Sequence, residues 1–356
     1  MQATAPSRID LAGGTLDIHP LYLFEEGGIT VNMAISLGSH VWLQTRRDAE
    51  VKITAECIGA QQHAASAEEL RLGGELDLIC RIVRYYRPSL GLDIISRNDA
   101  PKGSGLGASS SLLIALTGAL RELNGDDLSN QDIVRYGANL EAQNLGIPTG
   151  KQDYYSALNG GLNAIWFDVE GERVEPLGAN EWLLRELEDR LVLTFTGESR
   201  CSGTSNWAML KNYIDDRGTT VQDLRAIKQT AMAMREALLA GDLDRCAGLL
   251  DEEWQNRRRL AEGVTNERIE HLMSVAREAG ALASRLCGAG GGGCMISFAG
   301  AGRAKEVATA LVAAGAEHLP YKIDRRGLSV RVIGEQRVGG SETAAEPLMA
   351  ETVRLS

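Results

Sequence analysis

Hydrophobic positions along the chain follow two spacings, one typical of strands and one typical of helices. Alternating or β-rich runs predict strands at 29–37, 41–45, 92–96, 160–167, 191–196, 294–298 and 328–333. Apolar residues three or four positions apart predict helices at 67–87, 109–123, 130–145, 203–214, 219–240, 242–260, 266–280 and 304–314. Because the strands and helices mix without a regular strand–helix–strand alternation, we expect an α+β fold.

The pattern changes near residues 180–190, where mixed strands and helices give way to long helices. A chain of 356 residues is long enough to bury two cores. We therefore predict two domains, at 1–187 and 188–338. Little periodicity is left in 339–356, which we expect to form a loosely ordered tail.

Composition and charge narrow the class of protein. Hydrophobic residues make up 44% and charged residues 24% of the chain, which are ordinary values for a globular protein. The net charge of −11 leaves no basic excess to neutralise phosphates, which argues against nucleic acid and anionic membranes as partners. Six cysteines without a Cys-x-x-Cys spacing favour reduced thiols. Since the sequence also has neither a leader segment nor an apolar run of membrane-spanning length, we expect a cytoplasmic protein.

The segment 101–111 reads Pro-Lys-Gly-Ser-Gly-Leu-Gly-Ala-Ser-Ser-Ser and leads directly into the apolar stretch 112–120. Its three glycines, at every second position, allow a tight turn that brings backbone N–H groups close to a ligand. The helix that follows adds unpaired N–H groups and the positive end of its dipole, so the junction favours an anion such as phosphate. The alternative is a Gly/Ser-rich connector, but a flexible linker does not normally run straight into an apolar helix. Since no lysine follows Gly107, the segment is not the usual P-loop.

A second glycine-rich segment, 288–293, satisfies the pattern Gly-x-Gly-x-x-Gly through Gly288, Gly290 and Gly293. The dinucleotide fingerprint of that form needs a strand before it and a helix after it. Here we expect the reverse order, with a helix over 275–286 and a strand over 294–298. Taken alone, a glycine-rich turn between a helix and a strand is best interpreted as structural, without a bound ligand. Together with 101–111 it is a candidate second wall of one phosphate site.

Four polar residues are candidates for chemistry, although their spacing alone favours structural roles. Arg8 and Asp17 are nine residues apart, and the structural interpretation is an ion pair that fixes a strand and turn. The functional alternative is that Asp17 accepts hydrogen bonds from a polyol while Arg8 stabilises charge on a phosphoryl group. Glu141 lies at the edge of an apolar stripe in a helix that begins with the capping box Ser129–Asp132. By itself it reads as a solvated helix residue. Asp153 lies at a loop–helix junction, where an aspartate is usually a cap.

Taken together, these segments resemble the motifs of the GHMP kinases, a superfamily that includes galactokinase, homoserine kinase and mevalonate kinase. Segment 5–17 is similar to the first motif and 288–293 to the third. Segment 101–111 resembles the second motif, Pro-x-x-x-Gly-Leu-Gly-Ser-Ser-Ala, with Ala108 where the first serine usually stands. The resemblance covers nearly the whole chain up to about 332. It implies an N-terminal domain like the second domain of ribosomal protein S5 and a ferredoxin-like C-terminal domain.

Within the superfamily, several segments look like heptose 7-phosphate kinases and the kinase part of L-fucokinases. These segments are 9–14, 28–35, 195–202, 254–258 and 280–294. Residues 15–19 differ from the amino-acid sequence of those relatives at this position.

The resemblance implies ATP and Mg²⁺ as cofactors and assigns roles to the candidate residues. Phosphoryl transfer needs positioned phosphates, a metal and an aspartate near the attacking hydroxyl. Asp153 takes that catalytic role, assisted by Arg8 and Lys151. The implied metal ligands are Glu141 and Ser109, with Ser110 as the other candidate hydroxyl. The implied ATP-binding residues are Pro101, Gly103, Ser104, Gly105, Leu106, Gly107, Ala108, Ser109, Ser110, Gly288, Gly290 and Gly291. The implied acceptor-binding residues are Thr15, Asp17, His19 and Arg200, and Arg257 and Arg258 are further candidates for a substrate phosphate.

The predicted function is ATP-dependent transfer of the γ-phosphoryl group to a sugar hydroxyl, with the anomeric hydroxyl of a heptose 7-phosphate as the first choice. L-Fucose or another hexose is the alternative acceptor. Two other classes stay open, an ATP-dependent decarboxylase of the mevalonate type and a catalytically silent sugar- or ATP-binding regulator. The Arg8…Asp17 spacing argues against the carboxylic-acid substrate of the first. The presence of Ser109, Glu141 and Asp153 argues against the second.

Overall fold

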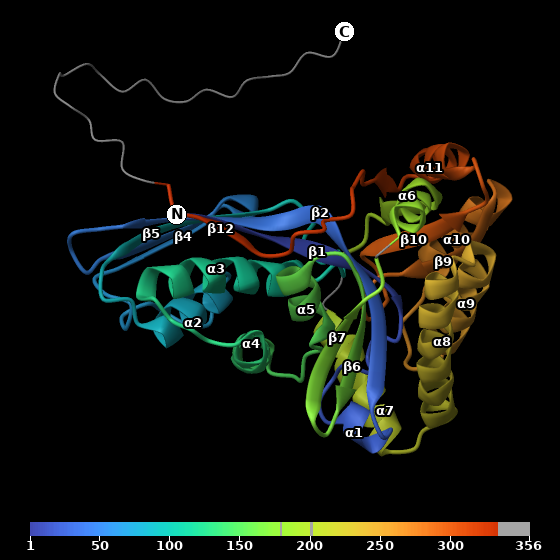
Figure 1. Cartoon of the computed structure of the whole chain (residues 1–356), viewed down its shortest axis with the longest axis horizontal. Helices are drawn as coiled ribbons and strands as arrows, with labels where there is room; N and C mark the ends of the chain where they lie inside the picture. The colour runs from blue at the N-terminus through green and yellow to red at the C-terminus, as the bar shows by residue number, and fades with distance from the viewer. Residues whose placement is uncertain (179, 200–201, 334–356) are drawn as a thin grey trace, which may run out of the picture.

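The computed structural model describes residues 1–178, 180–199 and 202–333. In this described part of the chain, two β-sheets are flanked by helices, which confirms the predicted α+β class (Figure 1). The predicted tail, 339–356, lies outside the described residues.

The larger sheet holds eight of the described strands in the order β12-β1-β2-β5-β3-β4, with β6 paired to β2 and β7 to β6. Only β3 and β5 run parallel among these pairs. The strands are β1 (Gln2–Ala12), β2 (Gly28–Thr45), β3 (Val51–Ala55), β4 (Ala60–Ala64), β5 (Leu92–Asn98), β6 (Leu162–Asp168), β7 (Gly171–Pro176) and β12 (Ser329–Arg331). This sheet is covered on one face by α2 (Asp77–Tyr86), α3 (Ala108–Asn124), α4 (Asn130–Leu145) and α5 (Gln152–Asn159).

The smaller, antiparallel sheet has the order β11-β8-β10-β9 among the described residues. Its strands are β8 (Leu191–Phe195), β9 (Ala281–Leu286), β10 (Cys294–Ala299) and β11 (Glu317–His318). The remaining helices are α1 (Leu21–Phe24), α6 (Glu181–Arg190), α7 (Ser202–Ile214), α8 (Thr220–Ala240), α9 (Leu243–Arg257), α10 (Glu267–Glu278) and α11 (Ala304–Ala313), with a 3-10 turn at Glu56–Ile58.

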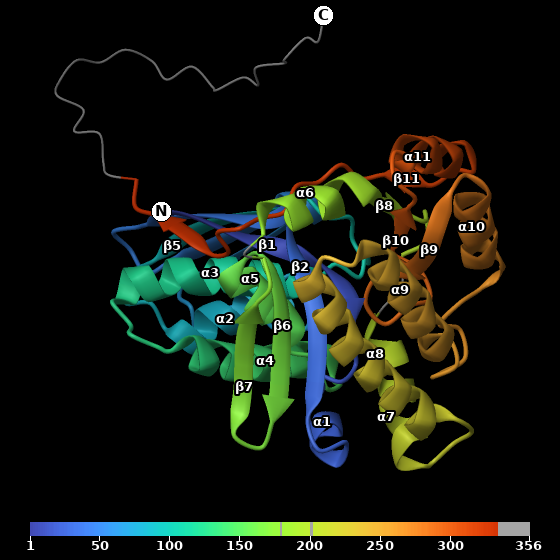
Figure 2. The same cartoon turned by 45° about the vertical axis from the view of Figure 1, so that its right-hand side comes forward.

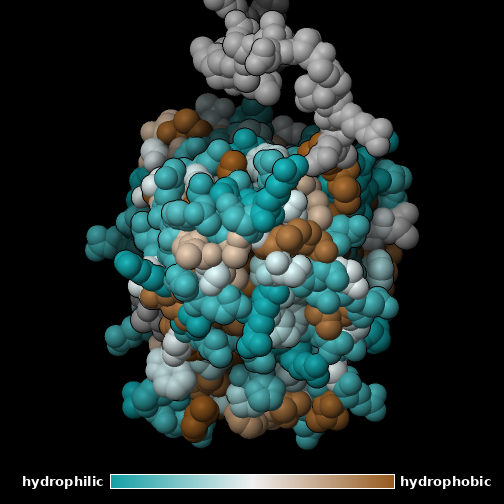
Figure 3. All heavy atoms as spheres, turned by 90° about the vertical axis from the view of Figure 1, so that its left-hand side faces the viewer, coloured by the Kyte–Doolittle hydropathy of each residue, from teal (hydrophilic) through white to brown (hydrophobic). Residues whose placement is uncertain are grey.

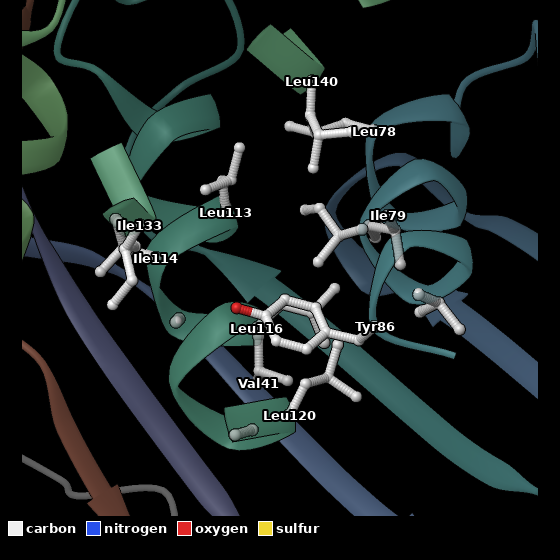
Figure 4. Packing of buried hydrophobic residues seen from close by; sticks show 14 of the residues in the cluster. Val41, Leu78, Ile79, Tyr86, Leu113, Ile114, Leu116, Leu120, Ile133 and Leu140 are labelled. Atoms are coloured by element: carbon white, nitrogen blue, oxygen red, sulfur yellow. The ribbon is translucent and has the colours of Figure 1, made fainter. Parts of the chain in front are cut away.

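Helix α3 is the central helix beneath the larger sheet. Its side chains Leu113, Leu116 and Leu120 are fully buried, and they pack toward Ile79 of α2 and Ile133 of α4 (Figure 4). Burying each such side chain contributes about 1.5–3 kcal/mol, so this apolar face holds the helix on the sheet. The start of the helix, where the site lies, is thereby anchored from behind.

Turn residues set the ends of the helices near the site. Gly107 has a φ of +76° and ends the loop just before α3 begins. The predicted capping box at the start of α4 is confirmed, because the Ser129 hydroxyl accepts a hydrogen bond from the backbone N–H of Asp132 at 3.1 Å.

Four predicted elements were wrong in extent. The helix expected over 67–87 is limited to α2, because Gly73 and Gly74 precede it and the N–H of Gly73 donates to Asp77. The strands expected at 29–37 and 41–45 are one strand, β2, in which Gly38 lets the backbone pass close to Ala5. The helix expected over 275–286 ends at Glu278, since 281–286 pairs with β10 as strand β9.

The two sheets are joined by elements that cross between them. Helix α8 packs against β1 and β2 and lies beside the β6–β7 hairpin, and helix α9 packs against β1 (Figure 2). The predicted boundary at 187/188 falls inside α6, and the chain returns at its end to the larger sheet, where β12 pairs with β1.

The face on the left of Figure 1 is largely hydrophilic, with small hydrophobic patches between polar residues (Figure 3). Within the described ranges, we find no helix with the length and apolar character needed to cross a membrane.

Candidate active site

A cavity lies where the ends of several elements meet: β1, the loop after it, the first glycine loop, the starts of α3, α5 and α7, and the second glycine loop. It brings together most residues that the sequence singled out. The described residues that line it are Arg8, Gly14, Thr15, Asp17, Ile18, Gly103, Ser104, Gly105, Gly107, Ala108, Ser109, Ser110, Glu141, Gly150, Gln152, Asp153, Asn206, Gly288 and Ala289.

The two glycine loops are in direct backbone contact. The N–H of Cys294 donates to the carbonyl of Ser104 at 2.7 Å. A Cβ atom added to Gly105 would lie 2.6 Å from the carbonyl oxygen of Cys287, and one added to Gly293 would lie 2.6 Å from that of Ser104. Backbone atoms cannot move aside as a flexible side chain can, so both positions require glycine. The loops therefore form one continuous wall, as expected of a single phosphate site.

The start of α3 presents backbone donors to this wall. Gly107, Ala108, Ser109 and Ser110 line the cavity, and no described side chain caps the first turn of the helix. The first N–H groups of a helix have no partner within it, and the helix dipole favours negative charge there. An anion such as a nucleotide phosphate fits this position.

A carboxylate and hydroxyl groups meet beside that helix start. The Ser110 hydroxyl donates to Oε2 of Glu141 at 3.1 Å, and the Tyr154 hydroxyl donates to the same oxygen. Burial raises the pKa of Glu141, while hydrogen bonds from Tyr154, Ser109 and Ser110 act in the opposite direction. Both candidate serines thus lie at the carboxylate.

These groups fit a magnesium ion that takes its other ligands from a nucleotide. No group of three or more His, Cys, Asp or Glu side chains that could hold a metal occurs in the part of the chain that is described. Mg²⁺ in kinases is commonly held by one or two carboxylates, substrate phosphates and water, so Glu141 with a serine hydroxyl is a suitable donor set.

Asp153 and Arg8 form a close pair beside the first glycine loop. Nε of Arg8 donates to Oδ1 of Asp153 at 2.6 Å, and its Nη1 donates to the carbonyl of Gly105 at 2.6 Å. Burial raises the pKa of Asp153, and the positive charge of Arg8 acts in the opposite direction. Burial alone would lower the pKa of Arg8, but Asp153 and Asp10 hold it above its ordinary value, so Arg8 stays charged. A carboxylate whose proton affinity is raised can accept a proton from a hydroxyl.

Asp17 also lines the cavity and is 2% exposed. Its Oδ2 accepts a hydrogen bond from the backbone N–H of Gln152 at 3.0 Å. Burial raises the pKa of this carboxyl to about 6. Gly150 passes so close that an added Cβ would lie 2.1 Å from Oδ2. Asp17 and Asp153 therefore line one cavity beside the start of α5.

Several predicted site residues lie elsewhere. The ammonium group of Lys151 pairs with Glu172 and lies over the ring of Tyr22, so the structure does not bring it into the cavity. His19 is exposed and meets the edge of the Tyr22 ring. Arg200 lies outside the described residues.

The arginines at the end of α9 and parts of both loops also differ from expectation. Arg257 is fully buried, and Arg258 pairs with Glu270, so neither is among the described residues that line the cavity. Leu106 is buried in the core, and the N–H of Gly291 donates to Val264. Pro101 and Gly290 likewise fall outside the described lining.

Sequence reasoning missed some residues that the cavity exposes. Gly150 and Gln152 precede Asp153 by three positions and by one, and this closeness in sequence was a usable signal. Asn206 comes from α7, about fifty residues further along the chain, and nothing in its local sequence marks it. Only the packing of α7 brings it to the cavity.

Comparisons with known proteins agree with this geometry. The family model for the GHMP kinases N terminal domain matches residues 77–161, and the model for the GHMP kinases C terminal region matches 234–317. The D-glycero-alpha-D-manno-heptose 7-phosphate kinase of Campylobacter jejuni is 32% identical over 304 residues, which cover 84% of this chain and 89% of that protein.

Solved structures show the same fold. A D-glycero-D-manno-heptose 1-phosphate kinase from Bacteroides thetaiotaomicron superposes with a TM-score of 0.77 at 28% identity, covering 94% of this chain and 99% of that one. The galactokinase of Lactococcus lactis in complex with galactose, 19% identical, shares the fold with a TM-score of 0.69 over 92% of this chain and 93% of its own. The expected two-domain fold is confirmed. Since a relative at 32% identity spans most of both sequences and both family models match, the chain belongs to the GHMP kinase family.

Proposed function

We propose that the protein transfers the γ-phosphoryl group of ATP to the anomeric hydroxyl of a heptose 7-phosphate. Membership of the GHMP kinases makes it an ATP-dependent phosphotransferase with an alcohol as acceptor. The observation that carries the proposal is the arrangement of Asp17 and the Asp153–Arg8 pair in one cavity with the glycine loops. The similarity to heptose phosphate kinases supports the choice of acceptor.

Different residues of this chain have different roles in the proposed transfer. Bound ATP supplies the phosphoryl group, and Mg²⁺ neutralises charge on its phosphates. The N–H groups of the glycine loops and the start of α3 bind those phosphates, while Glu141 with Ser109 or Ser110 would hold the metal. Asp153 accepts the proton of the attacking hydroxyl, and Arg8, fixed between Asp153 and the carbonyl of Gly105, stabilises charge as the phosphoryl group moves.

The acceptor lies against Asp17 in this proposal. An ionised carboxylate accepts hydrogen bonds from two neighbouring hydroxyls of a sugar, and Thr15 and Asn206 line the same cavity. Arg200, predicted from the sequence, stays our candidate to bind the phosphate that the acceptor carries.

One observation favours a second candidate, an unphosphorylated sugar such as L-fucose. Among the described residues that line the cavity, Arg8 is the only cationic side chain, and it is already paired with Asp153. An acceptor that carries no phosphate needs no further cation.

The experiment is ADP release with ATP, Mg²⁺ and a panel of acceptors: heptose 7-phosphate, the free heptose, L-fucose, galactose and mevalonate. We expect the highest kcat/KM with heptose 7-phosphate. A higher kcat/KM with a free sugar would establish the second candidate instead. Turnover of mevalonate alone would overturn both.

The location is a further proposal. The cysteines in the described ranges, Cys57, Cys80, Cys246, Cys287 and Cys294, are free thiols. Free thiols suit a reducing compartment, so we propose the cytoplasm.

A further inference from the structure

Arg257, at the end of α9, contacts the loop that carries the acceptor residues. Its side chain is fully buried. Nη2 donates to the carbonyl oxygen of Gly14 at 2.6 Å, and Nη1 donates to Oγ1 of Thr15 at 3.1 Å. A Cβ atom on Gly14 would lie 3.1 Å from Nη2, so the turn and the guanidinium group are closely fitted.

The turn that Arg257 contacts has an unusual backbone. Thr15 has a φ of +79°, in the left-handed region that β-branched residues rarely adopt. Such a conformation persists only where the surroundings hold it. Thr15 lines the cavity, and Asp17 follows two residues later, so the geometry of this turn decides where both acceptor residues lie.

Arg257 is itself held by a buried chain of alternating charges. Its Nε and Nη2 donate to Oε1 of Glu253 at 2.9 and 2.6 Å. Oε2 of Glu253 lies 3.0 Å from Nη1 of Arg285, and Nη2 of Arg285 donates to Oδ2 of Asp10 at 2.7 Å. All four side chains are 0% exposed. Oδ1 of Asp10 accepts a hydrogen bond from the N–H of Gly288, so this row of charged side chains connects α9 to the second glycine loop.

We propose that Arg257 is a positioning residue for the acceptor, which holds the Gly14–Thr15 turn in the left-handed conformation that places Thr15 and Asp17 in the cavity. Arg257 acts through the turn, since it is not among the described residues that line the cavity. This inference rests on the proposed function for the identity of the acceptor, but its effect on the turn is independent of that identity.

The test is Arg257→Lys, which keeps the positive charge beside Glu253 but replaces the two nitrogens that donate separately to Gly14 and Thr15 by a single ammonium group. We expect the KM for the best acceptor to rise by about tenfold or more, with the KM for ATP changed by less than about threefold. The matched control is Arg259→Lys, because Arg259 pairs with Asp223 away from the turn. It should leave both constants within about twofold.

A second substitution separates positioning from general loss of structure. Glycine adopts a φ of +79° without help, so in a Thr15→Gly background Arg257→Lys should raise the acceptor KM by less than about threefold. Equal effects of Arg257→Lys in both backgrounds, or a parallel rise in the KM for ATP, would overturn the inference. If Arg257→Lys is poorly folded, the charge-balanced variant Glu253→Gln/Arg257→Gln takes its place with the same expectation.

Amide hydrogen exchange measures how firmly the Gly14–Thr15 turn is held, and it needs no acceptor. The N–H groups of Leu16 and Ile18 donate to the carbonyls of Gly13 and Thr15 within the turn. These amides should exchange about tenfold faster or more in Arg257→Lys than in Arg259→Lys. Unchanged exchange would overturn the inference. Failure of the proposed function would instead appear as absence of sugar turnover in the unaltered protein.

Discussion

Replacing Gly150 by alanine tests the role of Asp17 with a single methyl group. The added Cβ would lie 2.1 Å from Oδ2 of Asp17 and 2.8 Å from its Cγ, whereas ordinary contact begins at 3.4 Å. The carboxylate must therefore move by roughly 1.3 Å, the difference between these contact distances. Gly150 is not among the residues with a positive φ, so the backbone accepts alanine and the effect comes from the side chain alone.

The magnitude follows from the hydrogen bonds that the displaced carboxylate can no longer make. A hydrogen bond to a charged group contributes about 1.5–3 kcal/mol. At about 1.4 kcal/mol for each factor of ten, loss of one such bond to the acceptor lowers kcat/KM by about 10- to 150-fold. A misplacement of about 1 Å in an active site has a similar cost, near 100-fold. The phosphate wall is not touched, so the KM for ATP should change by less than about threefold.

The assay is steady-state ADP release, with acceptor and ATP titrated separately. Gly248→Ala is the matched control, since a Cβ there meets no described atom within 4 Å. It should leave both constants within about twofold of the unaltered protein. If Gly150→Ala is folded and its acceptor kcat/KM stays within about threefold, Asp17 does not recognise the acceptor and our assignment is wrong.

Four further predictions address Asp153, Glu141, Lys151 and the pH dependence that Asp17 confers. Asp153→Ala should lower kcat by about 10²–10⁴-fold while ATP still binds in calorimetric titration, because the proton acceptor is lost; near-normal rates would remove Asp153 from the catalytic role. Glu141→Gln should raise the Mg²⁺ concentration for half-maximal rate by about tenfold, since an amide is a weaker ligand, and an unchanged Mg²⁺ titration would contradict this. Lys151→Met should change kcat by less than about threefold, because its ammonium group pairs with Glu172; a large loss of rate would show that it acts in the reaction. Burial raises the pKa of Asp17 to about 6, so acceptor kcat/KM should fall about tenfold per pH unit below that value, a limb that Asp17→Asn should lack. The effect of pH on the stability of the fold has the opposite sign, because the pKa of Asp17 in the folded protein lies above its ordinary value of 3.8. Protonated Asp17 stabilises the folded protein fully below pH 3.8, and this stabilisation is lost as the pH rises through about 6. Thermal unfolding of the unliganded protein across this pH range measures the loss.

Features with a local cause were predictable from the sequence. The start of α3 follows from glycines that permit left-handed backbone and from the apolar residues behind them. The start of α4 follows from the cap of Ser129. All three motif segments contribute residues to one cavity. Asp17 was found through the first motif, Glu141 and Asp153 through the resemblance to the superfamily as a whole, and their roles stay predictions.

Features with a long-range cause were not predictable. Residues 281–286, Ala-Leu-Ala-Ser-Arg-Leu, favour a helix by composition, but pairing with β10 makes them a strand. Arg257 was interpreted as a candidate for a substrate phosphate, and nothing in the sequence marks Arg285, because charged side chains are seldom buried. Their burial depends on Glu253 and Asp10, and Asp10 lies 275 positions from Arg285. A single sequence carries no sign of such a pairing.

The central claim is that this cleft phosphorylates the anomeric hydroxyl of a heptose that already carries a phosphate. Phosphorus NMR of the product formed from ATP and heptose 7-phosphate tests it most directly. We predict one new phosphate signal coupled to the anomeric proton, with the original phosphate unchanged and one ADP formed for each product. A new phosphate on any other hydroxyl, or ADP without a phosphorylated sugar, would contradict the account.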